Sequence, residues 1–317
     1  RFFTHWLSVA CWQGSKICLH QLSEESPVIW DLLLTVFQGQ TAPSIEKKRD
    51  ELVKQGLVLS AEEVNGFLEY CAVFFNNMGN YLSFGDTKFV PRVPKDKFGF
   101  LAEAFGTKQK DNVKKLFEAA AAKIYSLNAN ELMLGFPDQG GVSTYYSSNI
   151  TKAEIDLVGE FMVSKHISPY NTRLFKESPG VFRLVLAAAI DPPKLIATEK
   201  FKDVTVKIVK GDYGTILKDV ADALTMAQKY VSNDIEKEML QHYVKHFLGG
   251  DIDDHKASQK AWIKNVGPVV ETNIGFIESY RDPAGVRGEF EGFVAVVNKE
   301  TSRKVSRVCV VTDDLVW

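Results

Sequence analysis

The stretch GPVVETNIGFIESYRDPAGVRGEFEGFVAVVNK, residues 267–299, carries the densest strand signal of this chain. Because side chains alternate between the two faces of a strand, its period-2 pattern predicts four residues on one face. These are Ile274, Phe276, Glu278 and Tyr280. Pro283 and Gly285 then interrupt the strand, and a second alternating run covers residues 288–298. The stretch therefore predicts two strands around a tight connection, with several carboxylates gathered near its rim.

These carboxylates have two interpretations that the residues alone leave open. One is a functional site, because the carboxylate of Glu278 and the phenol of Tyr280 follow on the same face at the end of the strand. Alternatively, the charges of the hairpin only face water, and Glu278 forms an ion pair with Arg281 or Arg287.

Composition restricts the class of protein. The 317 residues exceed the size at which a single core usually stops growing, so we expect two packed sub-regions. A hydrophobic content of 45% and a charged content of 25% are ordinary for a globular protein. The net charge of -2 offers no electrostatic case for nucleic acid or for an anionic membrane as a partner. No apolar run approaches the ~18 residues that would suggest a membrane span.

Cysteine usage indicates a reducing compartment. The four cysteines are scattered along the chain, which favours reduced thiols and a cytoplasmic protein over a disulfide framework. They are Cys11, Cys18, Cys71 and Cys309. The chain begins at Arg1 inside an apparent helix, and we expect a further N-terminal piece to precede it.

Hydrophobic periodicity predicts an α+β fold. Residues 1–135 have mostly helical spacing, with a capping box at Ser60–Glu63, and a second capping box at Thr151–Glu154 opens a later helix. Short β-rich runs follow, separated from the two late strands by three more helices. The expected early strands are 142–147, 170–176, 181–187 and 204–209, and the expected helices are 213–231, 234–247 and 253–264. About six short strands would form a small, curled mixed sheet or a barrel, on which the helical N-terminal half packs.

We accordingly predict three regions along the chain. Residues 1–135 form a mainly helical part, residues 136–298 a barrel-like β part with helices, and residues 299–317 a divergent tail. Within the first region, the loop 76–91 interrupts the helical pattern with Asn, Gly, Ser and Asp at close spacing. This loop is either a structural turn or a segment that places Phe84, Lys88 and backbone amides beside a ligand.

The usual catalytic and metal-binding motifs are missing from the sequence. His242 and His246 have the i, i+4 spacing that can chelate zinc, but the Glu that activates water in a His-Glu-x-x-His site is absent between them. A partly exposed helix face is the favoured interpretation of this pair. There is no G-x-G-x-x-G, no Walker loop and no G-x-S-x-G elbow. We therefore predict no metal ligands and no catalytic residues in this chain.

Four segments resemble the dipeptidyl peptidase III family of zinc exopeptidases, in the same order. They are NMGNYLSFGDTKFVP (Asn77 to Pro91), YNTRLFKE (Tyr170 to Glu177), KGDY (Lys210 to Tyr213) and IGFIESYRDPAGVRGEFEGFVAVVNK (Ile274 to Lys299). The resemblance extends over most of the chain up to Lys299. The family holds zinc with a His-Glu-x-x-x-His helix and a further Glu, and no residues here match either element.

The resemblance implies a substrate-binding lobe without its zinc-binding lobe. It implies that Glu278 binds the N-terminal ammonium of an oligopeptide, that Tyr280 donates a hydrogen bond to a peptide or transition-state oxygen, and that Phe84 contacts a substrate side chain. Zinc would be bound only by the full-length enzyme, so this chain would be inactive alone. Its partners would be an oligopeptide substrate and the missing lobe.

Two alternatives stay open at this point. One is a non-catalytic peptide- or protein-binding module derived from such a lobe, with apolar surface exposed where a partner lobe would pack. The other is an unrelated α+β scaffold whose carboxylates are all surface charge.

Overall fold

The computed structural model describes residues 1–54 and 60–306 of the chain. Its named helices are α1 (Phe2–Leu22), α2 (Ser26–Phe37), α3 (Ala42–Lys54), α4 (Ala61–Asn77), α5 (Lys95–Phe105), α6 (Lys110–Ile124), α7 (Lys152–Ser164), α8 (Gly214–Ala227), α9 (Asp234–Gly249) and α10 (Ile252–Trp262). Its strands are β1 (Thr172–Ser178), β2 (Val181–Ala187), β3 (Lys194–Phe201), β4 (Val204–Asp212), β5 (Val270–Phe276) and β6 (Phe290–Val296). The α+β class is thus confirmed.

Local capping signals set two helix starts where the sequence predicts them. At α4, the Ser60 side chain accepts from the Glu63 backbone N–H, and the Glu63 carboxylate accepts from the Ser60 N–H. Thr151 and Glu154 make the same reciprocal pair at α7. Each box satisfies two backbone donors that a helix N-terminus otherwise leaves without partners.

The larger sheet is mixed and open. Its strand order is β1-β2-β4-β3, with β2 and β4 parallel and the other two pairs antiparallel. β1 and β2 form the predicted hairpin, whose turn contains Gly180 at a φ of 70°. The curled mixed sheet is confirmed, whereas the described residues form no closed barrel.

One strand prediction was wrong, and one strand was not predicted. Residues 142–147 form no named strand and make only isolated bridges, including Tyr146 to Leu174. Tyr145 and Tyr146 are neighbours and both buried, although a half-buried strand would alternate. Strand β3 was not predicted, because its exposed charged residues and the prolines before it are typical of an edge strand as well as of a loop.

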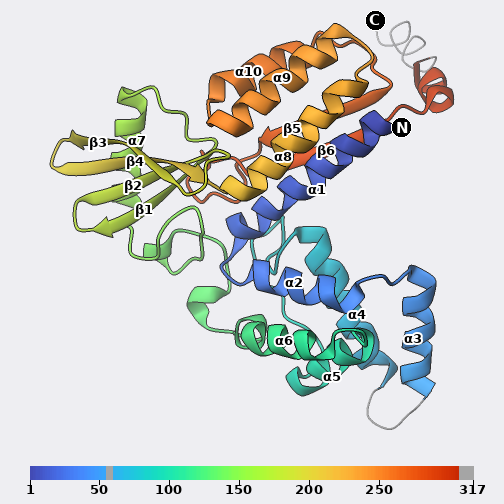
Figure 1. Ribbon diagram of the computed structural model, residues 1–317. Helices are drawn as coiled ribbons and strands as arrows, with labels where there is room; N and C mark the ends of the chain where they lie inside the picture. Colours follow the sequence, from blue (N-terminus) through green and yellow to red (C-terminus); the bar gives the residue numbers. More distant parts are fainter. Residues whose placement is uncertain (55–59, 307–317) are drawn as a thin grey trace, which may run out of the picture.

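Three clusters of buried apolar side chains organise the molecule. One joins α2 to α6 at the bottom of Figure 1, one lies between α7 and the four-stranded sheet, and one joins α1, α8, α9, α10 and the β5–β6 pair. Although α1 opens the helical half, its buried side chains, including Leu7 and Ile17, belong to the cluster of α8 and β6. The long helix α1 therefore leads from this layer to the helices below it, as Figure 1 shows.

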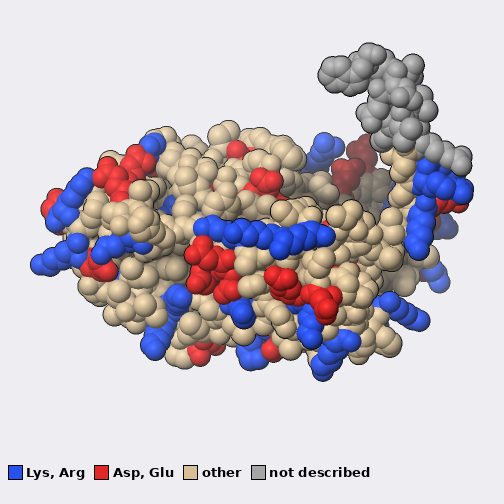
Figure 2. Space-filling model, turned by 90° about the horizontal axis from the view of Figure 1, so that it is seen from above, with Lys and Arg blue, Asp and Glu red and all other residues tan. Residues whose placement is uncertain are grey.

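The surface carries charges of both signs close together. On the face shown in Figure 2, Lys and Arg side chains alternate with Asp and Glu side chains. No helix among residues 1–54 and 60–306 combines the length and the apolar character needed to cross a membrane.

Candidate functional site

The predicted site residues lie in two loops that the fold brings together. Tyr280 follows β5, and Phe84 belongs to the loop after α4. Their ring centroids are 6.5 Å apart at an interplanar angle of 42°. Both rings are open to solvent, with 85% of Phe84 and 64% of Tyr280 exposed. An exposed aromatic pair offers large apolar area to a ligand, which a buried pair does not.

The predicted alternation holds for only part of its length. Ile274 and Phe276 are buried, as expected for one strand face, but β5 ends at Phe276. Glu278 and Tyr280 therefore lie beyond the strand. Two backbone hydrogen bonds continue the pairing there, from Ile277 N to Glu289 O at 2.9 Å and from Glu289 N to Glu278 O at 2.6 Å. Glu278 is thus held by main-chain bonds although it is outside the regular strand.

The Glu278 carboxylate lies beside the phenol of Tyr280. The proximity of this negatively charged carboxylate raises the pKa of Tyr280. Tyr280 consequently stays protonated and able to donate at neutral pH. Burial raises the pKa of Glu291, with a further contribution from Glu278, so the expected gathering of carboxylates is present. Such a group attracts a cation.

The two arginines near Glu278 are occupied elsewhere. The Nε of Arg281 lies 3.1 Å from a carboxylate oxygen of Glu289, and Nη1 of Arg287 donates to the Tyr146 hydroxyl at 2.8 Å. Within the described part of the chain, Glu278 forms no ion pair with Arg281 or Arg287. The geometry therefore leaves the carboxylate of Glu278 to Tyr280 and to solvent.

Asp282 fixes the loop that carries these groups. Its carboxylate accepts from the backbone N–H groups of Ala284, Val286 and Arg287 at 2.8–3.0 Å. It also accepts from the Tyr146 hydroxyl at 2.7 Å. The side chain of Asp282 is buried, so these four bonds are needed to satisfy it.

Lys88 does not lie beside this site. Its side chain is only 1% exposed and donates from Nζ to the Lys123 carbonyl at 2.7 Å, with Glu25 at 4.0 Å. Burial lowers the pKa of Lys88. The expectation that Lys88 contacts a ligand next to Phe84 is therefore wrong, because its ammonium points into the protein.

The histidine pair on α9 does not fit a metal ion. The Nδ1 of His242 is 3.0 Å from Asp254, and Nδ1 of His246 donates to the Asp251 carbonyl at 2.7 Å. His246 is moreover 1% exposed. Among residues 1–54 and 60–306 there is no group of three or more His, Cys, Asp or Glu placed to hold a metal ion. The family's zinc therefore has no matching ligand set in the described residues.

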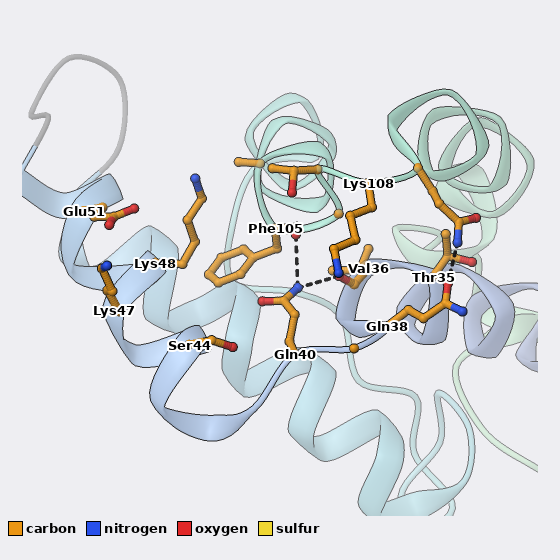
Figure 3. A pocket seen from close by; sticks show the side chains of 15 residues that line it. Thr35, Val36, Gln38, Gln40, Ser44, Lys47, Lys48, Glu51, Phe105 and Lys108 are labelled. Atoms are coloured by element: carbon orange, nitrogen blue, oxygen red, sulfur yellow. Dashed lines mark hydrogen bonds between the residues drawn. The ribbon is translucent and has the colours of Figure 1, made fainter.

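Two hollows lie away from the aromatic pair. One of about 340 Å³, drawn in Figure 3, lies between α2, α3 and the α5–α6 connection, and its lining includes Gln40, Lys47, Lys48 and Lys108. The amide of Gln40 donates to the Val36 and Phe105 carbonyls. A second hollow of about 680 Å³ lies between the α1–α2 corner, the loop before α7 and β1. Phe84, Glu278 and Tyr280 line neither hollow.

Comparison with known proteins decides the family. The family model described as Peptidase family M49 matches residues 116–316. The chain belongs to peptidase family M49. The resemblance to the dipeptidyl peptidase III family is thereby confirmed. The alternative of an unrelated α+β scaffold is excluded.

Several similar M49 proteins are longer than this chain. It is 47% identical over 309 residues to dipeptidyl peptidase 3 of Dictyostelium discoideum, covering 97% of this chain and 43% of that protein. It is 42% identical to dipeptidyl peptidase 3 of Nematostella vectensis and 38% identical to that of Homo sapiens, covering 43% and 44% of their lengths. The solved structure of DPP III from Caldithrix abyssi superposes with a TM-score of 0.52 at 14% identity, over 99% of this chain and 42% of that one. The chain thus spans less than half the length of these relatives and shares their fold.

Three further buried polar residues near the loop that carries Tyr280 were not among the predicted site residues. They are Tyr146, Asp282 and Arg287, which form hydrogen bonds with one another. The Asp-Pro step at 282–283 was a usable signal for Asp282, because Asp side chains accept from backbone groups that follow them in turns. No local signal indicates Tyr146, which lies far away in the sequence.

Proposed function

We propose that this chain is the substrate-binding lobe of a dipeptidyl peptidase III-like enzyme that releases dipeptides from the N-termini of oligopeptides. The proposal divides the chain into a helical part (1–135), a β part with helices (136–298) and a tail (299–317), of which residues 307–317 lie outside the described residues. It also assigns the lobe to the cytoplasm.

One observation carries the proposal: Glu278, Tyr280 and Phe84 lie together although they come from distant segments. A dipeptidyl peptidase must recognise a free α-ammonium and hold two residues beyond it. A half-buried carboxylate beside other carboxylates is suited to the ammonium, and an exposed aromatic ring is suited to an apolar substrate side chain.

Tyr280 has a second function in this proposal. In the free chain the carboxylate of Glu278 lies beside its phenol. When an ammonium binds Glu278, the protonated phenol donates to a peptide oxygen. A neutral donor placed at that oxygen stabilises the negative charge that develops there during hydrolysis.

The proposal assigns no zinc chemistry to this chain. When bound in a full-length M49 enzyme, zinc would polarise the scissile carbonyl and activate water. In the proposal its ligands belong to a second lobe, and this chain by itself binds and orients peptide without cleaving it. The printed names of the relatives, dipeptidyl peptidase 3, support the reaction class.

Isothermal titration with an unstructured tetrapeptide tests the ammonium site. We expect Glu278→Gln to weaken binding by about tenfold, the effect of losing one charged hydrogen bond of ~1.5 kcal/mol. An N-acetylated form of the same peptide should bind the wild-type chain as weakly as the free peptide binds the variant. Glu62→Gln, on the exposed side of α4, is the matched control and should leave the affinity unchanged.

Equal affinity for the free and acetylated peptides would refute the ammonium assignment. The same conclusion follows if Glu278→Gln and Glu62→Gln behave alike.

A second candidate is a non-catalytic peptide- or protein-binding module built from the same lobe. Its support is the exposed apolar surface around the β5–β6 pair, where Val266 is 92%, Val296 61%, Val269 55% and Phe293 47% exposed. Surface of this kind commonly marks an interaction site. The two candidates differ in whether the parent transcript continues into a His-Glu-x-x-x-His segment, so sequencing that transcript separates them.

A further inference from the structure

Arg281 joins two segments that lie 204 residues apart in the sequence. Its Nη2 donates to the Asn77 carbonyl at 2.7 Å and to the Ser83 hydroxyl at 2.9 Å. Its side chain is 5% exposed, so these bonds are made away from water. Arg281 follows Tyr280, and Ser83 precedes Phe84, so the guanidinium bridges the two residues next to the aromatic pair.

Both ends of this bridge are themselves fixed. Asn77 accepts on Oδ1 from the Ser83 backbone N–H at 2.8 Å and from its hydroxyl at 3.0 Å. On the other side, Arg281 pairs with Glu289, whose side chain is 12% exposed and whose backbone N–H donates to the Glu278 carbonyl. Movement of the guanidinium would therefore displace the Phe84 loop relative to the segment that contains Glu278 and Tyr280.

The guanidinium group suits this arrangement better than an ammonium would. Its planar set of N–H donors reaches a carboxylate with Nε and two oxygens of another loop with Nη2 at the same time. A Lys ammonium is a single point of charge at the end of a flexible chain and does not fix this geometry.

We infer that Arg281 is a positioning residue, which holds the Phe84 ring against Tyr280 and so builds the wall along the first residues of a bound peptide. This inference rests on the proposed function, since it concerns the shape of the proposed peptide-binding site. Arg281 acts through Phe84 and Tyr280 and does not itself contact the peptide.

Arg287 provides a matched control for Arg281. Both arginines are buried and lie in the same loop, at 6% and 2% exposure. Arg287 donates to Tyr146 and stacks over its ring, with 4.9 Å between the guanidinium carbon and the ring centroid. Among the described residues, it forms no hydrogen bond to the Phe84 loop. If Arg281 contributed only to stability, Arg281→Lys and Arg287→Lys would have equal effects on the Phe84–Tyr280 ring contact and on peptide affinity.

The test combines ring-to-ring nuclear Overhauser contacts with peptide titration. Samples carry selectively labelled Phe and Tyr rings, and the Phe84–Tyr280 signal is assigned by its loss in Phe84→Leu. We expect Arg281→Lys to abolish this signal and to weaken tetrapeptide binding at least fivefold, whereas Arg287→Lys should keep both. Ser83→Ala removes only one end of the bridge, and we expect it to reduce the signal in a chain that still folds, as checked by circular dichroism.

A retained ring contact in both Arg281→Lys and Ser83→Ala would overturn the inference. Equal loss in Arg287→Lys would overturn it too, as would a lost contact with unchanged peptide affinity. If the wild-type chain binds no peptide, the proposed function fails, and the nuclear Overhauser contact still decides whether Arg281 places the rings.

Discussion

Arg281 and Arg287 show how burial selects ion-pair partners at the scale of single residues. The sequence places Glu278, Glu289 and Glu291 near both arginines. Arg281 pairs with the nearly buried Glu289, and Arg287 turns to Tyr146. A buried guanidinium needs partners that are buried with it, because a lone charge removed from water is costly. Glu278 is thereby left available at the surface.

A half-buried histidine beside a buried one predicts acid sensitivity. Burial, aided by the charge of His246, lowers the pKa of His255 from 6.5 to about 4, and the two rings lie 5.2 Å apart. Because the folded-state pKa lies below the unfolded value, unfolded chains take up this proton first, and stability falls as the pH drops from about 6.5 to about 4. The loss from His255 is on the order of 3 kcal/mol at full extent.

Urea unfolding at pH 7 and pH 5 measures this effect. We expect His255→Gln to lose less stability between the two values than the wild-type chain, while His5→Gln, exposed on α1, should follow the wild type. If His255→Gln and His5→Gln lose equal stability, the assigned cause is wrong.

At the scale of elements, α1 approaches β6 through a glycine. A Cβ atom built on Gly14 would lie 2.1 Å from Cζ of Phe290, whose side chain is 1% exposed. The close contact brings the helix onto the strand pair, and it also lets Cys18 donate to the Phe290 carbonyl. Packing across α1 thus depends on the absence of one methyl group.

Two glycine-to-alanine substitutions separate packing from helix propensity. Alanine is favoured over glycine inside a helix by ~1 kcal/mol. At Gly14 we expect overpacking against Phe290 to outweigh this gain and to destabilise the fold by about 1–3 kcal/mol. At Gly159 of α7 no atom lies within 4 Å of the new methyl group, so Gly159→Ala should stabilise the fold. Denaturant unfolding of both variants gives the two signs, and a stabilised Gly14→Ala would contradict the contact.

At the scale of the whole molecule, three apolar clusters support one open site. The loop of Phe84 follows α4 of the lower helical cluster, while Tyr280 follows β5 of the cluster around α1. Arg281 connects the two clusters. Residues at the C-terminal end of α4 do so too, such as Met78, which packs against both clusters. The aromatic pair therefore depends on how two separately packed parts meet.

The hydrogen bonds of the two histidines on α9 predict that the isolated chain neither needs nor uses zinc. His242 and His246 engage Asp254 and Asp251, so neither presents a preorganised pair to a metal ion. We expect EDTA to leave the melting temperature unchanged, and mass spectrometry of a tetrapeptide incubated with the chain and zinc to show no released dipeptide. Stoichiometric zinc in the purified chain, or dipeptide release abolished by EDTA, would contradict this expectation.

The sequence by itself determined the α+β class, the two capped helix starts, the β1–β2 hairpin and the absence of the usual metal and catalytic motifs. These features depend on contacts between residues close in the chain, or on residue types alone, so local patterns are sufficient to predict them. It also singled out Phe84, Glu278 and Tyr280 through a family resemblance.

Only the tertiary structure decided which carboxylate pairs with Arg281, that Lys88 points inward, and that Phe84 meets Tyr280. It also decided that residues 142–147 make only isolated bridges, one of them to β1, and that the charged β3 forms one edge of the sheet. These outcomes depend on segments up to 204 residues apart, and on which polar groups lose their water when those segments pack. Local propensity carries no information about either.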